Sequence, residues 1–427
     1  GDVGFFLAAL WLTLFVRYGS ALNDVVWMGH LVPFSFLFAV WALVFFIAGL
    51  YEKHTLILRN RLPSIILRAQ VINSGIAVLF FYFVPYFGIT PKTNLFIDLF
   101  FSFGFIYLWR VYFFSFLGFK KKEKALLVGS GEEMKELKKE VNENRRYALT
   151  FISSLDLNDI DDIDFRNEVL SRIYSEGVST VVIDLRNEKV MPILPQLYNL
   201  IFSKVRFIDK YKIYEDIFDR VPLSLVNYNW FLENISSSSH MTYDFLKRGM
   251  DISLSVLLGV VSILLYPFVY LAIKLDDGGS VFFTQERVGK NNKTINIVKF
   301  RTMSSKDALK VTRVGNILRK MRVDELPQLW NVIRGDLSLV GPRPEMPHFS
   351  KTYEKEIPYY NVRHLIKPGL SGWAQIHQET PPKFDVGYDE TKTKLSYDLY
   401  YVKNRSLLLD LKIALRTIKT LLSRSGI

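Results

Sequence analysis

The chain has 427 residues, enough for several domains, and carries a net charge of +12 at pH 7. Hydrophobic residues make up 49% of it and aromatic residues 15%, which indicates a membrane protein rather than a soluble one. The absence of cysteine excludes disulfides, thiolate catalysis and cysteine-bound zinc, and the positive charge suits anionic lipid, phosphorylated substrates or nucleic acid. The sequence starts at Gly1, so it does not establish the native start of the protein.

Four apolar segments occupy residues 1–119, and each predicts a membrane-spanning helix. They cover residues 3–16, 31–50, 65–87 and 95–119. The loop Tyr18–His30, between the first two, lacks Lys and Arg, whereas the next loop and the end of the fourth segment are basic. The basic residues are Lys53, Arg59, Arg61, Arg68, Lys120, Lys121, Lys122 and Lys124. Because basic loops stay in the cytoplasm, we expect four spans with both ends inside, and Arg110 near the end of the fourth to snorkel toward headgroups.

Residues 120–235 show short apolar strands alternating with helices, which predicts a Rossmann-like α/β domain with a parallel sheet. Gly129 and Gly131 follow the first strand and precede a helix, as a dinucleotide site requires. The position of the third glycine is Met134, so a domain that keeps the fold and binds no nucleotide is favoured over an NAD site. A regulatory ligand is left open. A serine-rich linker, residues 235–240, follows.

Residues 252–273 form a run of 22 uncharged residues, long enough to span a bilayer, with Pro267 well inside it. A complete span would carry the basic region that follows across the membrane, which Lys- and Arg-rich segments resist. Both flanks of the run are also basic, through Lys247, Arg248 and Lys274. We therefore expect a broken, re-entrant helix that bends at Pro267 and returns to the same face.

The region 311–345 carries two adjacent acids, Asp324 and Glu325, after a basic amphipathic helix. Asp324 is well placed to cap a second helix that has Pro327 in its first turn and ends at Gly335. The helix dipole and the nearby arginines would hold these carboxylates ionised. An ionised carboxylate can bind Mg²⁺ or attack phosphorus, although Asp324 could also be only a helix cap.

Fixed cations gather in the same part of the sequence. Lys299 and Arg301 are two residues apart and should share one face of a strand, and Arg343 lies between Pro342 and Pro344. Several rigidly held cations beside carboxylates suit a diphosphate with a magnesium ion. The histidines show no metal-ligand spacing, so we expect them to be structural or to contact substrate at most.

The motifs "FTQERVG", "KFRTM", "LRKMRVDELPQLWNVIRGDLSLVGPRPE" and "KPGLSGWAQIH" together resemble the bacterial sugar transferases, which are monotopic polyprenyl-phosphate phosphoglycosyl transferases. The resemblance is dense over residues 243–417, and the layout of the whole chain resembles the long form of this family. It implies a membrane protein of class α plus α/β. Its parts would be a four-helix transmembrane bundle (1–119), a CoA-binding-like, Rossmann-like domain (120–235) and a mainly helical monotopic catalytic domain (236–427). The re-entrant helix would lie at about residues 252–273.

The resemblance also implies a reaction. A UDP-sugar would donate its sugar phosphate to undecaprenyl phosphate through a covalent intermediate on Asp324, with Mg²⁺ as cofactor and Glu325 as a metal ligand or proton partner. Lys299, Arg319 and Arg343 match the phosphate-contacting positions of the family, and Arg301 is added from strand geometry. The resemblance further implies a bacterial inner membrane location with the active site on the cytoplasmic face, a role in exopolysaccharide, O-antigen or capsule synthesis, a possible homodimer and no nucleic-acid partner. The sugar is not indicated.

Three other classes are weighed against this reaction. A membrane-anchored, NAD-dependent enzyme that modifies nucleotide sugars would need the glycine fingerprint that Met134 interrupts. A transporter would leave the motifs after Asp251 unexplained, and an inactive scaffold would not need the intact pair of Asp324 and Glu325.

Overall fold

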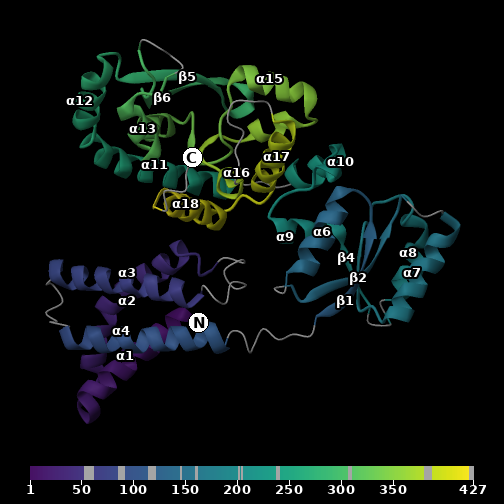
Figure 1. Cartoon of the computed structure of the whole chain (residues 1–427), viewed down its shortest axis with the longest axis horizontal. Coiled ribbons are helices and arrows are strands. Elements are labelled where there is room, and N and C mark those ends of the chain that lie inside the picture. Colours follow the sequence, from purple (N-terminus) through teal and green to yellow (C-terminus); the bar gives the residue numbers. More distant parts are fainter. Residues whose placement is uncertain are drawn as a thin grey trace. The chain divides into compact units, whose positions relative to one another are not determined.

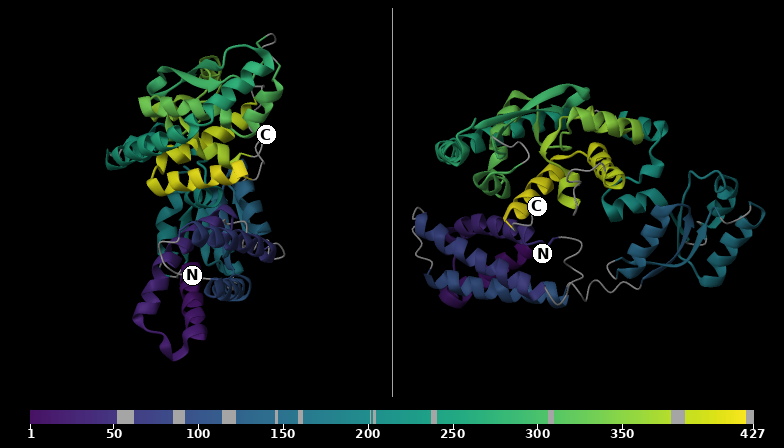
Figure 2. Two further views of the ribbon diagram at one scale, coloured as in Figure 1. Left: turned by 90° about the vertical axis from the view of Figure 1, so that its left-hand side faces the viewer. Right: turned by 45° about the horizontal axis from the view of Figure 1, so that its top comes forward.

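The computed structural model describes the chain in two compact units, Gly1–Ile208 and Asp209–Ile427 (Figures 1 and 2). The described residues are 1–51, 62–84, 92–113, 122–144, 147–158, 162–200, 202, 205–236, 241–305, 310–378 and 387–422. Five of the basic residues that oriented the predicted spans, namely Lys53, Arg59, Arg61, Lys120 and Lys121, lie outside them, as do residues 237–240 of the serine-rich linker.

The first unit opens with four apolar helices. They are α1 (Asp2–Tyr18), α2 (Asp24–Ile47), α3 (Leu62–Phe83) and α4 (Lys92–Tyr107), the last continued by a π-helical turn, η3 (Leu108–Phe113). Each forms or belongs to a helix long and apolar enough to cross a membrane, which confirms the four predicted apolar helices. Their shared core is aromatic, because Phe6 packs against Phe38, Trp41 and Phe45.

The snorkelling interpretation of Arg110 is wrong. Its side chain is 8% exposed and forms a buried ion pair with Asp2 at the start of α1. Arg110 also donates a hydrogen bond of 2.8 Å to the carbonyl oxygen of Leu50. A guanidinium inside an apolar bundle gains more from a charged partner than from a long reach to water, so this arginine ties α1 to the end of the fourth apolar segment.

The rest of the first unit is a parallel α/β sheet, as predicted. Its elements are β1 (Glu123–Gly129), α6 (Glu132–Glu143), β2 (Leu149–Asp156), α7 (Asp162–Glu176), β3 (Thr180–Ile183), α8 (Leu194–Leu200) and β4 (Arg206–Asp209). The strand order is β2-β1-β3-β4, and β1 pairs in parallel with both β2 and β3. Figure 1 shows α6 on one face of the sheet and α7 and α8 on the other. The connection from β1 to β2 and the connection from β2 to β3 run in opposite directions across the sheet. Because both crossovers are right-handed, their helices lie on opposite faces.

The helix that follows the glycine turn of this sheet begins with acidic residues, whereas a dinucleotide site needs backbone amides free to bind phosphate. Gly131 has a φ of 87°, and α6 begins directly after it with Glu132 and Glu133. Met134 is buried at 6% exposure, so it serves the core. Two carboxylates in the first helical turn oppose a bound pyrophosphate.

The second unit is mainly helical, with two short sheets. Its helices are α9 (Lys210–Phe218), α10 (Tyr228–Phe231), α11 (Met241–Ile263), α12 (Tyr266–Asp277), α13 (Arg313–Lys320), α14 (Leu329–Arg334), α15 (Pro347–Glu356), α16 (Trp373–His377), α17 (Tyr388–Lys403) and α18 (Leu407–Leu422). The strands are β5 (Phe282–Val288) and β6 (Thr294–Phe300), which form an antiparallel hairpin, and β7 (Ser338–Val340) and β8 (Gly369–Ser371), which pair in parallel.

Residues 209–235 pack within this second unit. The Val221 amide donates to the carbonyl oxygen of Ser396 at 3.1 Å, and Glu215 forms an ion pair of 2.8 Å with Lys403. Trp230 is buried at 1% exposure in the same core cluster as Leu399. The domain boundaries expected at 119/120 and 235/236 stay predictions.

The apolar run is broken into two helices that are bent by 55°. Helix α11 ends at Ile263 and α12 starts at Tyr266, with Pro267 in the first turn of α12. The Ser262 hydroxyl donates to the Gly259 carbonyl oxygen at 2.8 Å just before the break. Exposed apolar side chains cover both arms, including Leu264 at 70% and Phe268 at 73% exposure. Such a surface requires an apolar environment, and the bend fits either a broken span or a re-entrant hairpin.

Candidate active site

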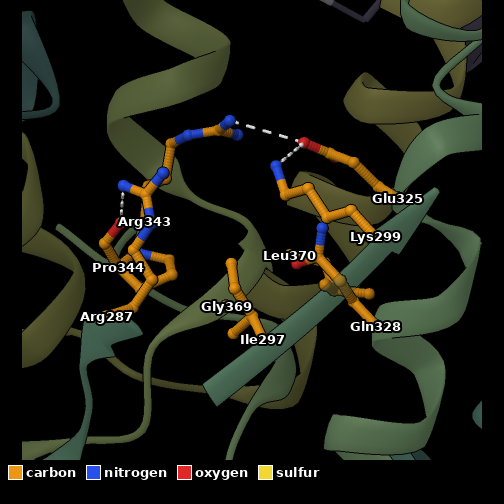
Figure 3. Close-up of a pocket in the computed structure, with 9 residues that line it drawn as sticks. All are labelled: Arg287, Ile297, Lys299, Glu325, Gln328, Arg343, Pro344, Gly369 and Leu370. Atoms are coloured by element: carbon orange, nitrogen blue, oxygen red, sulfur yellow. Dashed lines mark hydrogen bonds and ion pairs between the residues drawn. The ribbon is translucent and has the colours of Figure 1, made fainter. Parts of the chain in front are cut away.

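A small cleft in the second unit gathers residues from the β5–β6 hairpin, from a 3₁₀ segment, η9 (Val323–Gln328), and from the loop before α15. Its walls are Arg287, Ile297, Lys299, Glu325, Gln328, Arg343, Pro344, Gly369 and Leu370. Figure 3 shows the side chains of Lys299 and Arg343 both directed toward the Glu325 carboxylate. The antiparallel register of the hairpin places Lys299 opposite Phe283 and Arg287 opposite Ile295.

Glu325 is the counter-ion of the cleft. Its Oε1 lies 3.3 Å from Lys299 Nζ and 3.4 Å from a guanidinium nitrogen of each of Arg322 and Arg343. Burial alone would raise the pKa of Glu325, but Arg343, Lys299 and Arg322 outweigh it and lower that pKa to about 2. Glu325 is therefore ionised throughout the neutral range, as the sequence predicted.

The pKa values of two cations in the cleft are lowered by their surroundings. Burial, and then the neighbouring Arg343, lower the pKa of Arg287 to about 10. Burial also lowers the pKa of Lys299 against the opposing effect of Glu325. One carboxylate thus faces more positive charge than it neutralises, and such a cleft favours an additional anion.

Asp324 is placed differently from its neighbour. It is 8% exposed, and its Oδ1 has no hydrogen-bond partner in the described part of the chain. Burial, followed by the charge of Glu325, raises the pKa of Asp324 against the effects of Lys299 and Arg322. The expectation that its surroundings would favour the ionised form is wrong in direction, because desolvation and a like charge outweigh the cations.

The predicted helix cap is also wrong. Arg322 has a left-handed backbone conformation (φ 56°), and the 3₁₀ segment η9 follows it without a side-chain cap. Helix α14 begins only at Leu329. Pro327 lies inside η9 rather than in the first turn of an α-helix. Gly335 ends α14 with a φ of 102°, which confirms the predicted helix stop.

Of the predicted site residues, Lys299, Arg343 and Glu325 line the cleft. Asp324 does not line it, but it is close enough to feel the charges of Glu325 and Lys299. Arg301 is held elsewhere. Arg301 pairs with Asp277, with Nη1 at 3.1 Å from Oδ2, and it does not line the cleft. Strand β6 ends at Phe300, so the alternation that was expected to align Lys299 with Arg301 stops one residue short. The two therefore do not act on one site.

The two remaining predicted arginines differ in what holds them. Arg319 donates from Nε to the Thr302 hydroxyl at 2.9 Å and does not line the cleft, but its charge acts on Asp324. The Arg343 carbonyl oxygen accepts a 2.9 Å hydrogen bond from the buried Arg363, which pairs with Asp398 at 2.7 Å. A buried ion pair thus fixes the backbone of a cleft arginine.

Sequence reasoning missed Arg287, Arg322 and Gln328. Arg287 stands in the "FTQERVG" motif, where strand pairing with the "KFRTM" segment was the available signal. Arg322 lies three residues before Glu325 and contacts it, so its spacing from the acidic pair was the available signal. Gln328 carried no signal, because its place follows from the 3₁₀ path of the chain.

Within the described residues, no group of three or more His, Asp and Glu side chains could hold a metal by itself. Magnesium usually takes one or two carboxylates and completes its shell with substrate phosphates and water. The pair of Asp324 and Glu325 fits that pattern, since Asp324 Oδ1 is a buried acceptor that no donor satisfies. His364 and His377 bond to Asn292 and to the Trp373 carbonyl oxygen, consistent with structural roles.

Comparison with known proteins identifies the second unit. Residues 242–424 match the model of a family described as bacterial sugar transferase. A UDP-N-acetylgalactosamine-undecaprenyl-phosphate N-acetylgalactosaminephosphotransferase of Aeromonas hydrophila is 44% identical over 199 residues, which cover 43% of this chain and 45% of that protein. An undecaprenyl-phosphate glucose phosphotransferase of Komagataeibacter xylinus is 40% identical over 188 residues, 40% of this chain and 35% of that protein.

A shorter relative is matched over nearly its whole length. The exopolysaccharide production protein PSS of Rhizobium leguminosarum bv. phaseoli is 41% identical over 196 residues, which cover 42% of this chain and 96% of that protein. By contrast, this chain matches less than half the length of the Aeromonas and Komagataeibacter proteins. The shared part is the unit that holds the cleft.

Proposed function

Because the chain belongs to the bacterial sugar transferase family, we propose that it transfers a sugar phosphate from a UDP-sugar to undecaprenyl phosphate and releases UMP. The names of the Aeromonas and Komagataeibacter relatives support the lipid acceptor. Those two proteins are named for different sugars at similar identity, so the comparison selects no sugar for this chain. In this proposal the reaction starts the synthesis of a bacterial surface glycan.

The observation that carries the proposal is a cleft of excess positive charge around Glu325, with the buried Asp324 next to Glu325 in the chain. Lys299, Arg287 and Arg343 would bind the diphosphate of the donor, since ionised donors to phosphate oxygens are strong and directional. The same cations would stabilise the charge that builds on the transferring phosphoryl group. Glu325 would hold Lys299 and Arg343 in place until the donor arrives.

Asp324 would act as the nucleophile in a two-step transfer. Its carboxylate oxygen forms a bond to the β-phosphorus of the donor while the bond from that phosphorus to the bridging oxygen breaks, and UMP leaves with the electron pair. An oxygen of the polyprenyl phosphate then attacks the phosphosugar on Asp324 and restores the free carboxylate. The raised pKa of Asp324 suits this role, because a more basic carboxylate is a better nucleophile.

Asp324 and Glu325 are the residues that would hold Mg²⁺, which would neutralise diphosphate charge when bound. Asp324 Oδ1 is the free acceptor for it, and Glu325 remains anionic at every physiological pH.

We further propose that α11 and α12 form a re-entrant hairpin in the bacterial inner membrane, with the cleft on the cytoplasmic face. Basic residues flank the apolar arms, and a same-side return keeps the cleft with the cytoplasmic pool of nucleotide sugars. Pro267 would set the bend at the 55° break. The polyprenyl chain could then stay in the bilayer while its phosphate reaches Asp324. A homodimer stays a prediction.

The test is a panel of radiolabelled UDP-sugars with undecaprenyl phosphate and Mg²⁺, scored by UMP release and by label retained on the protein. Asp324→Asn should abolish both signals, because an amide cannot form the intermediate. Asp389→Asn, which changes an exposed aspartate of α17, serves as the matched control and should keep them. Label on Asp324→Asn at the wild-type level would mean that another residue is the nucleophile.

A further inference from the structure

A second cavity, of about 300 Å³, lies in the same unit beside the N-terminal half of α11. It shares no lining residue with the cleft of Asp324 and Glu325. Five cations from four separate segments line it: Lys247, Arg248, Lys290, Lys367 and Arg405. Only two acids, Asp244 and Asp251, stand among its lining residues, so the cavity has an excess of positive charge.

Three of the five cations are already engaged by the protein. Lys247 forms an ion pair of 2.8 Å with the buried Asp410. Arg248 donates to the carbonyl oxygens of Val332 and Ile333 at 2.7 and 2.8 Å. Arg405 lies 3.6 Å from Asp244. These contacts build the walls of the cavity.

Lys290 and Lys367 differ from those three. Within the described part of the chain, neither ammonium group makes a hydrogen bond or an ion pair. Burial, followed by the charge of Arg248, lowers the pKa of Lys367, which shows that its positive charge is poorly compensated. The charges of Asp251 and Asp336 oppose this lowering without reversing it, and neither carboxylate forms an ion pair with Lys367 in the described residues. Two cations in one cavity thus lack an anionic partner.

The position of the cavity indicates where its anion comes from. Asp251 is the last charged residue of α11 before the break, and the uncharged run, with its many exposed apolar side chains, begins at Ile252. Arg248 lies four residues earlier, which is only about 6 Å along a helix at 1.5 Å per residue. If the apolar arm enters a bilayer, the cavity opens at the depth of the lipid headgroups.

We propose that this cavity binds the phosphate of an anionic membrane lipid, with Lys290 and Lys367 as its contacts. The inference rests on the membrane placement of α11 in the proposed function, but not on the chemistry at Asp324. The volume is at the lower end for ligand sites, which suits a phosphate with a small glycerol group. Val340 and Ile366 supply an apolar wall for the start of the lipid chains.

The test measures lipid binding to the full chain in detergent, by the rise in its unfolding temperature. Dioctanoyl phosphatidylglycerol is titrated against dioctanoyl phosphatidylcholine and inorganic phosphate. A variant with both Lys290→Gln and Lys367→Gln should bind phosphatidylglycerol roughly 10- to 30-fold more weakly, since each lysine near an anionic lipid contributes on the order of 1 kcal/mol. Lys351→Gln with Lys355→Gln, on the exposed side of α15, is the matched control and should bind like the wild type.

Three results would overturn the proposal. The first is equal affinity of the double variant and the wild type for phosphatidylglycerol. The second needs no variant: it is a wild-type chain with no preference for phosphatidylglycerol over phosphatidylcholine. The third is an equal response to inorganic phosphate, which would make a soluble phosphate the ligand. Asp324→Asn should still bind the lipid, so failure of the transferase reaction and failure of this site can be told apart.

Discussion

Replacing Glu325 by Gln removes the one carboxylate that Lys299, Arg322 and Arg343 share, and it changes the shape of the side chain very little. The pKa of Glu325 falls from 4.5 to about 2 in the folded protein. At about 1.4 kcal/mol for each pKa unit, that fall corresponds to a stabilisation of about 3 kcal/mol. Its side chain is 17% exposed, so solvent screening removes little of this.

The sign of the effect depends on pH. A lowered folded-state pKa stabilises the protein above the unfolded value of 4.5, and the contribution is lost as pH falls from 4.5 to about 2. At pH 7 we expect Glu325→Gln to lower the free energy of unfolding by about 3 kcal/mol. For a unit of this size, that lowers the unfolding temperature by roughly 6–12 °C.

The assay is thermal unfolding of the full chain in detergent at pH 7, repeated at pH 5.5, where the difference between variant and wild type should persist. Glu354→Gln, which alters an exposed glutamate of α15, controls for the loss of a negative charge and should shift stability by no more than about 0.5 kcal/mol. A Glu325→Gln chain as stable as the wild type would refute the view that this carboxylate balances the cleft.

Two further predictions concern pH and a buried ion pair. Because the pKa of Asp324 is raised, turnover should fall at acid pH with an apparent pKa above 3.8. The pKa of Glu325 is about 2, so Glu325 should add no second step between pH 4 and 8. A pH profile of UMP release measures both. Asp398→Asn removes the nearer of the two carboxylates that pair with the buried Arg363, the other being Glu345 at 3.5 Å. It should destabilise the chain by about 3–5 kcal/mol in denaturant unfolding, with a lower kcat in the folded fraction because Arg363 holds the Arg343 backbone.

Patterns that are local in sequence predicted much of the fold. Long apolar runs predicted the four helices of the first unit, and strands alternating with helices predicted its parallel sheet. The proline in the apolar run predicted the break before Pro267. In each case the signal lies within one element or between neighbouring elements, so no long-range contact had to be known.

The site was less predictable, because its partners come from distant parts of the chain. Arg301 shares a motif with Lys299, but it pairs with Asp277, which lies 24 residues earlier at the end of α12. The acidic pair was found from its motif, yet its charge states depend on burial and on cations from three segments. No local pattern reports how deeply a side chain is buried.

The local backbone conformation gives the two neighbouring carboxylates different surroundings and therefore different roles. Successive side chains of a 3₁₀ segment, at three residues per turn, point about 120° apart, so Asp324 and Glu325 lie in different surroundings although the charges of Lys299 and Arg322 act on both. Glu325 faces three cations and its pKa falls, whereas Asp324 is buried beside that charge and its pKa rises. Adjacent groups whose environments shift their pKa values in opposite directions commonly divide the chemistry between them. An anion held by three cations is a poor nucleophile, and one with an unpartnered oxygen is a good one. We therefore infer that Glu325 organises the cleft and that Asp324 is the group that reacts.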